Sequence, residues 1–150
     1  MNNLQFRKWV AHGAAYGALV RANATIEEVA IVGTAYIEDK DSTDVDILVL
    51  LRPGCRPAEE LYLENWTYSG SNAAHTNDKF ASFKRVVMGV TVNLLVTSDV
   101  LYFMDWVTAA EVCRFLHVMG VPVPAGVRHG IHEIIMDDST AEQEATRRNY

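Results

Sequence analysis

The 150-residue chain lacks the features of a membrane or secreted protein. No apolar run approaches the roughly 20 residues that span a bilayer, and residues 1–10 lack the apolar core of a signal peptide. Only two cysteines are present, Cys55 and Cys113, which lie far apart without CxxC spacing. We therefore expect a cytoplasmic protein with reduced thiols and no membrane partner.

Positive charge is also scarce. Thirteen Lys and Arg residues face nineteen Asp and Glu residues, which gives a net charge of −6 and argues against broad electrostatic binding of DNA or RNA. A local basic cluster remains at Lys79, Lys84 and Arg85. Because Lys84 and Arg85 alternate on a predicted strand, only one of them can face a given site, and we favour Lys84.

The length and the apolar patterning predict one domain, residues 1–136, with a polar tail at residues 137–150. We expect an α+β fold in which helices pack against a small mixed sheet of about four strands. The expected helices are residues 4–22, 58–66, 100–119 and 127–136, and the expected strands are residues 29–32, 45–51, 80–87 and 90–97. Polar loops are expected at residues 33–43 and 69–78.

The most informative stretch is residues 29–51. A short apolar run ends in Gly33-Thr34, and Asp44 and Asp46 then open a second apolar run. On a strand these carboxylates share one face about 7 Å apart, and Val45 points to the other face. Two such carboxylates repel each other unless a cation lies between them. The pattern therefore indicates a Mg²⁺ site that faces a phosphate-bearing substrate.

This stretch resembles the signature of the nucleotidyltransferase superfamily, which has the polymerase-β-like fold. The signature is an apolar strand ending in Gly-Ser or Gly-Thr, a loop, Asp-x-Asp at the start of the next strand, and a third carboxylate on a later strand. The resemblance covers roughly residues 4–120. It is strongest to small single-domain members and looser to short phage-encoded proteins.

The resemblance implies a Mg²⁺- or Mn²⁺-dependent transfer of a nucleotidyl group from a nucleoside triphosphate to a hydroxyl on a protein, an RNA or a small molecule. Asp44 and Asp46 would be the metal ligands. Gly33, Thr34 and Lys84 would bind the nucleotide through its phosphates.

The chain departs from the signature at the third carboxylate. The expected apolar-acid-apolar triplet is Val92-Asn93-Leu94, so Asn93 takes the acid's position. An amide oxygen can ligate Mg²⁺ but has no charge and cannot accept a proton from a nucleophile, and general-base help is worth about 10²–10⁴-fold in rate. The chain is then either a slow enzyme or a catalytically degenerate relative that binds a protein or nucleotide partner. Asp99 remains an alternative third acid, although it fits a helix N-cap better; Asp78 and Glu64 fit less well.

Other chemistry-bearing residues have simpler interpretations. His129 and His132 could share a helix face, but no third metal ligand follows at helical spacing. His75 lies in a polar loop that could cover the site. The long helix at residues 100–119 could form a homodimer interface. An apolar stripe on that helix is expected to pack on the sheet: Tyr102, Phe103, Trp106 and Val107. An unrelated α+β enzyme is the remaining possibility.

Overall fold

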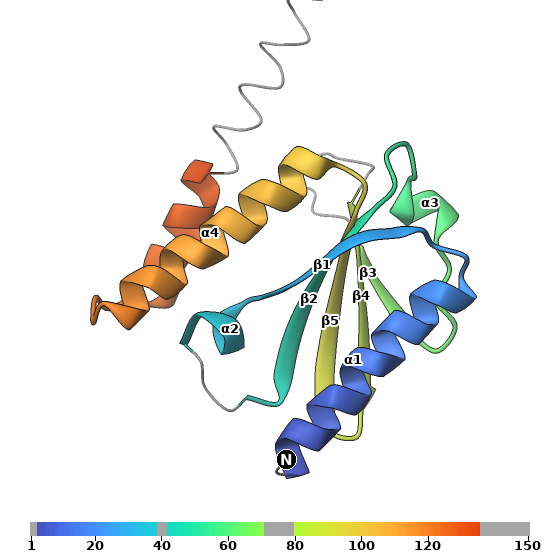
Figure 1. Ribbon diagram of the computed structural model, residues 1–150, viewed down its shortest axis with the longest axis horizontal. Helices are drawn as coiled ribbons and strands as arrows, with labels where there is room; N and C mark the ends of the chain where they lie inside the picture. Colours follow the sequence, from blue (N-terminus) through green and yellow to red (C-terminus); the bar gives the residue numbers. More distant parts are fainter. Residues whose placement is uncertain (1–2, 39–41, 71–79, 136–150) are drawn as a thin grey trace, which may run out of the picture.

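The computed structural model describes residues 3–38, 42–70 and 80–135 (Figure 1). His75, Asp78, Lys79 and the predicted tail at residues 137–150 lie outside the described residues. The elements are α1 (Asn3–Arg21), β1 (Ile26–Val32), α2 (Thr34–Glu38), β2 (Asp44–Leu51), α3 (Pro57–Glu60), β3 (Thr67–Gly70), β4 (Phe80–Val87), β5 (Val90–Thr97) and α4 (Val100–Val118). A further helix, here called the terminal helix, spans residues 125–135.

The fold is α+β, as predicted, with a mixed sheet in the order β1-β2-β5-β4-β3. β2 and β5 run parallel at the centre, and every other neighbouring pair is antiparallel. The centre is apolar on both faces, because residues 47–51 of β2 are all buried. The predicted hairpin between β4 and β5 is confirmed, and its turn residues Met88 and Gly89 both have positive φ, the backbone that two-residue hairpin loops favour.

The expectation of about four strands was one too few. β3 has only four residues, begins just after the expected helix at residues 58–66, and overlaps the start of the expected loop at residues 69–78. Its strand conformation depends on pairing with β4, where Thr67 lies opposite Lys84. The helices also differ from the prediction: α2 lies inside the expected loop at residues 33–43, and α3 has four residues instead of nine. Elements this short are held by tertiary contacts, which local periodicity does not reveal.

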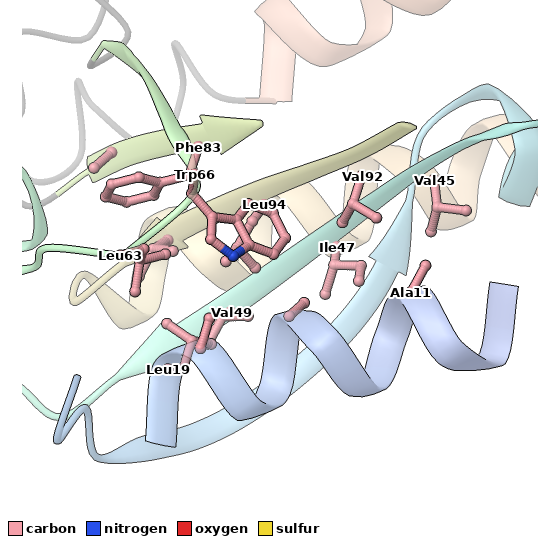
Figure 2. Packing of buried hydrophobic residues seen from close by; sticks show 14 of the residues in the cluster. Ala11, Leu19, Val45, Ile47, Val49, Leu63, Trp66, Phe83, Val92 and Leu94 are labelled. Atoms are coloured by element: carbon pink, nitrogen blue, oxygen red, sulfur yellow. The ribbon is translucent and has the colours of Figure 1, made fainter. Parts of the chain in front are cut away.

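One face of the sheet is covered by α1 (Figure 2). Ala11, Ala15, Ala18 and Leu19 of α1 are buried against the side chains of alternate strand residues. Ile47 and Val49 of β2 are among them, and each buried side chain of this size contributes about 1.5–3 kcal/mol. The small alanines let the helix approach the sheet closely.

The opposite face is covered by α4 and α2. Phe103 and Ala110 of α4 pack on Leu48 and Leu50 of β2, which confirms part of the predicted apolar stripe. α4 begins after Asp99, whose carboxylate accepts hydrogen bonds from the backbone N–H groups of Leu101 and Tyr102 at 3.1 and 3.2 Å. Within the described ranges, no helix combines the length and apolarity needed to cross a bilayer.

Candidate functional site

Three polar side chains predicted as site residues lie in one row across the sheet. In the strand register, Asp46 of β2 lies opposite Asn93 of β5, and Asn93 lies opposite Lys84 of β4. Residues that lie opposite each other on neighbouring strands point to the same face, and Asp44, two residues before Asp46, shares that face. It is the α4 face, because Leu48 of the same alternating set packs under α4. Arg85 points to the α1 face, so Lys84 is the member of the basic pair that faces the row.

Gly33 lies against the carboxylate of Asp46. The backbone of Gly33 has φ of +85°, and a Cβ added there would lie 2.7 Å from Cγ of Asp46 and closer still to Oδ2. Real side chains do not approach that closely, so only glycine leaves room for the carboxylate. The end of β1 and the start of β2, separated by a loop, therefore meet at one point.

Contacts with α4 hold the Gly33–Thr34 turn in place. Tyr36 of α2 donates its hydroxyl to the carboxylate of Glu111, which is the main reason that the pKa of Tyr36 is raised. Arg114 donates to the carbonyl of Tyr36 and lies over its ring, 4.7 Å from the centroid. Two residues of one helix thus fix α2, and with it the turn that packs on Asp46.

The surroundings of Asp46 shift the pKa of its carboxylate. Burial raises the pKa of Asp46 above the ordinary value, and the neighbouring charge of Asp44 raises it further. A hydrogen bond from the amide of Asn93 and the positive charge of Lys84 lower it. Burial therefore outweighs the amide and the ammonium group, and the pKa of Asp46 stays raised.

The raised pKa predicts a pH-dependent stability difference between the wild type and Asp46→Asn. The folded state binds the proton of Asp46 more tightly than the unfolded chain does. The contribution of Asp46 is therefore full below the ordinary pKa of 3.8 and is lost as the pH rises through the raised value. We expect the free energy of unfolding of the wild type, relative to Asp46→Asn, to fall over that range in urea titrations with chelator present.

The Asp44→Asn background provides the control for that titration. Without the charge of Asp44, the pKa of Asp46 is raised less, so the fall should be smaller. A difference between wild type and Asp46→Asn that is the same at every pH would contradict the assignment.

Asn93, the residue at the third-acid position, donates a hydrogen bond to Asp46. A carboxylate at that position could not make this bond while ionised. Asp99, the alternative third acid, lies six residues further along, past the opposite end of β5, and caps α4. Glu64 lies outside the row, on an exposed turn before β3. We call Asp44, Asp46 and Asn93 the acid row, which therefore consists of two carboxylates and one amide.

A cavity of about 310 Å³ opens over this row. Asp46 and Asn93 line it together with the hydroxyl residues Ser69 and Ser82 and the half-buried ring of Trp106. The serines were not predicted as site residues, because isolated serines carry no motif. Trp106 was expected only to pack on the sheet; it also forms a wall of this cavity.

Thr34, the predicted phosphate ligand, accepts a hydrogen bond from the guanidinium of Arg128 on the terminal helix. Accepting this bond leaves the hydroxyl proton of Thr34 free to be donated. Arg128 was not predicted as a site residue, since it lies 94 positions along the chain from Thr34 and belongs to no motif.

The donor set fits Mg²⁺ as proteins usually hold it. Mg²⁺ takes oxygen ligands, commonly one or two carboxylates completed by substrate phosphates and water. Asp44 and Asp46 supply carboxylates whose mutual repulsion a cation would relieve, and the amide oxygen of Asn93 is a third donor of the right kind. Among the described residues, no group of three or more His, Cys, Asp or Glu side chains could hold a metal ion, so the substrate would have to complete the site.

Comparisons with known proteins leave the site to be interpreted from its own geometry. The chain matches no protein family, no curated protein and no solved structure at a significant level.

Proposed function

We propose that the chain binds a nucleoside triphosphate over the acid row and transfers its nucleotidyl group to a hydroxyl acceptor, with Mg²⁺ or Mn²⁺ as cofactor. The observation that carries the proposal is the packing of Gly33 against Asp46. It joins a phosphate-accessible glycine turn to a pair of carboxylates, and nucleotidyl transfer needs both at one point. The resemblance to nucleotidyltransferases rests on the same residues.

Each residue has a distinct role in this proposal. The hydroxyl of Thr34 donates to a phosphate oxygen, and Lys84 offsets negative charge on the open face. Asp44 and Asp46 would hold the metal ion, which supplies neutralisation of the phosphates and orientation of the attacking hydroxyl. The hydrogen bond from Asn93 lowers the pKa of Asp46 and so favours its ionised form. The bond from the α-phosphorus to pyrophosphate breaks as the bond to the acceptor oxygen forms, and the hydroxyl proton passes to solvent.

Calorimetric titration with ATP, GTP, CTP and UTP, with and without Mg²⁺, tests the proposal. We expect at least one nucleotide to bind in a Mg²⁺-dependent manner, and we expect the variant with both Asp44→Asn and Asp46→Asn to lose that dependence. Replacing Glu27 and Glu28, exposed acids of β1 outside the row, by Gln is the matched control. Binding of no nucleotide by the wild type, or equal binding by the double Asn variant, would contradict it.

Asn93 favours a second function, the binding of a partner without catalysis. A relative that binds a nucleotide or a basic protein partner without turnover needs the acid pair but not a proton acceptor at the third position. The amide of Asn93 stabilises Asp46 without a metal ion, which suits a site selected for binding. Pyrophosphate release by the wild type well above background would exclude this function.

A cytoplasmic location and self-association through residues 100–119 remain predictions of the sequence. The outward side of α4 supports the second of these, because Leu101, Met104 and Phe115 are all exposed on it.

A further inference from the structure

A second cavity, of about 270 Å³, lies between α2, α4 and the terminal helix. It adjoins the cavity over the acid row, and Gly33 and Trp106 line both. Its polar lining comes from Thr34, Arg128 and two histidines, and its lining contains no Asp or Glu. The chain has a net charge of −6, yet this cavity is lined by a cation, Arg128, and by no acid.

Arg128 has a hydrogen-bond donor that no described group accepts from. One terminal nitrogen donates to the hydroxyl of Thr34, and Nε is buried without a partner among the described residues. An unpaired buried donor is unfavourable, so Arg128 is arranged for an acceptor that the described part of the chain does not supply. The planar guanidinium fork matches the spacing of phosphate oxygens.

Two histidines of the terminal helix, His129 and His132, also line the cavity. His129 follows Arg128 directly, and His132 lies about one helical turn further on the same helix. The ring of His132 contacts the ring of Trp106 edge-on, with centroids 5.1 Å apart. Ala109 and Ala110 line the α4 side, where their small side chains leave space. The cavity thus combines N–H donors with an aromatic wall, Trp106, that it shares with the cavity over the acid row.

We propose that this cavity is a phosphate-binding subsite in which Arg128 is the principal ligand and His129, His132 and the Thr34 hydroxyl are additional donors. Its volume admits a phosphate group with a small organic moiety. Phosphate could come from the terminal phosphates of the nucleotide or from a phosphorylated small-molecule acceptor. The inference that the cavity binds an anion depends on the cavity alone. A role of the subsite in nucleotidyl transfer rests on the function proposed above.

Titration of the full chain with inorganic phosphate and with pyrophosphate, in chelator and without divalent metal, tests the subsite. We expect Arg128→Gln to weaken binding about tenfold or more, and Arg128→Lys, which keeps the charge but not the fork, to weaken it less. Arg85→Gln, on the α1 face of the sheet, is the control and should leave binding unchanged. Thermal melting checks that each variant is folded.

Two further titrations identify the source of the phosphate. If Arg128→Gln weakens binding of a non-hydrolysable triphosphate but not of the monophosphate, the subsite holds the terminal phosphates. If pyrophosphate or a sugar phosphate binds in the presence of saturating triphosphate, the subsite holds a separate acceptor. Phosphate binding should persist when Asp44 and Asp46 are replaced by Asn. The subsite proposal can therefore be right even if the proposed nucleotidyl transfer is wrong. Absence of phosphate and pyrophosphate binding in the wild type, or equal weakening by Arg128→Gln and Arg85→Gln, would overturn the proposal.

Discussion

Gly33→Ala is expected to abolish Mg²⁺-dependent nucleotide binding and to lower the free energy of unfolding by about 2–4 kcal/mol. Two costs combine at this position. The backbone has φ of +85°, which disfavours any residue with a Cβ, and the new Cβ would lie 2.7 Å from Cγ of Asp46. The carboxylate would have to move out of the acid row, so the site would be lost together with the stability. Chemical denaturation and nucleotide calorimetry measure the two effects separately.

Two other glycines provide matched controls for this prediction. Gly54 and Gly120 have φ of +88° and +84°, and nothing lies within 4 Å of a Cβ added to either. Gly54→Ala and Gly120→Ala should therefore show only the backbone cost, about 1–2 kcal/mol, with nucleotide binding intact. In an Asp46→Gly background, which removes the Asp46 atoms that the added Cβ would meet, Gly33→Ala should cost no more than these controls. Equal costs at Gly33 and Gly120 in the wild-type background would show that the packing on Asp46 is unimportant.

Asn93→Asp is expected to have opposite effects with and without metal. Without metal, the variant loses the hydrogen bond to Asp46 and places a third carboxylate beside two others, which should cost about 1–3 kcal/mol of stability. With Mg²⁺ or Mn²⁺, the added ligand and proton acceptor should tighten metal binding and raise the rate of pyrophosphate release by about 10²–10⁴-fold. Denaturation with and without metal, and a coupled pyrophosphate assay, measure these changes.

Asn93→Ala separates the charge from the lost hydrogen bond. It removes the amide donor without adding a carboxylate, so it should be less stable than the wild type in all conditions and gain no activity. A large gain in Asn93→Asp over a near-zero wild-type rate would identify a binding protein on a preserved catalytic scaffold. If folded Asn93→Asp showed no change in metal affinity or turnover, position 93 would not belong to a metal site.

The parts of the fold that the sequence predicts are those with strong local signals. β5 and the hairpin turn have the predicted bounds, because a β-branched run and Met88-Gly89 specify them without help from the rest of the chain. β3 and α2 were not predicted as a strand and a helix, because they are short and depend on β4 and on α4 for their contacts. Tertiary contacts decide such segments, whatever their local preference.

The same distinction applies to the candidate site. Asp44, Asp46, Gly33 and Thr34 can be recognised from the sequence because they lie close together in it, and the strand register places Asn93 beside Asp46. Arg128 reaches Thr34 only through the packing of the terminal helix, and no spacing rule links positions that are 94 residues apart. The functional roles of all these residues remain predictions that the experiments above test.

Crystals soaked with Mn²⁺ and a non-hydrolysable nucleoside triphosphate would test the central claim most directly. The anomalous signal of Mn²⁺ locates the metal independently of the nucleotide. We predict a Mn²⁺ peak between the carboxylates of Asp44 and Asp46, bridged to the nucleotide phosphates beside Gly33, and no peak there in crystals of the double Asn variant. Well-ordered crystals with no Mn²⁺ at these carboxylates, or with the nucleotide bound away from them, would contradict the account.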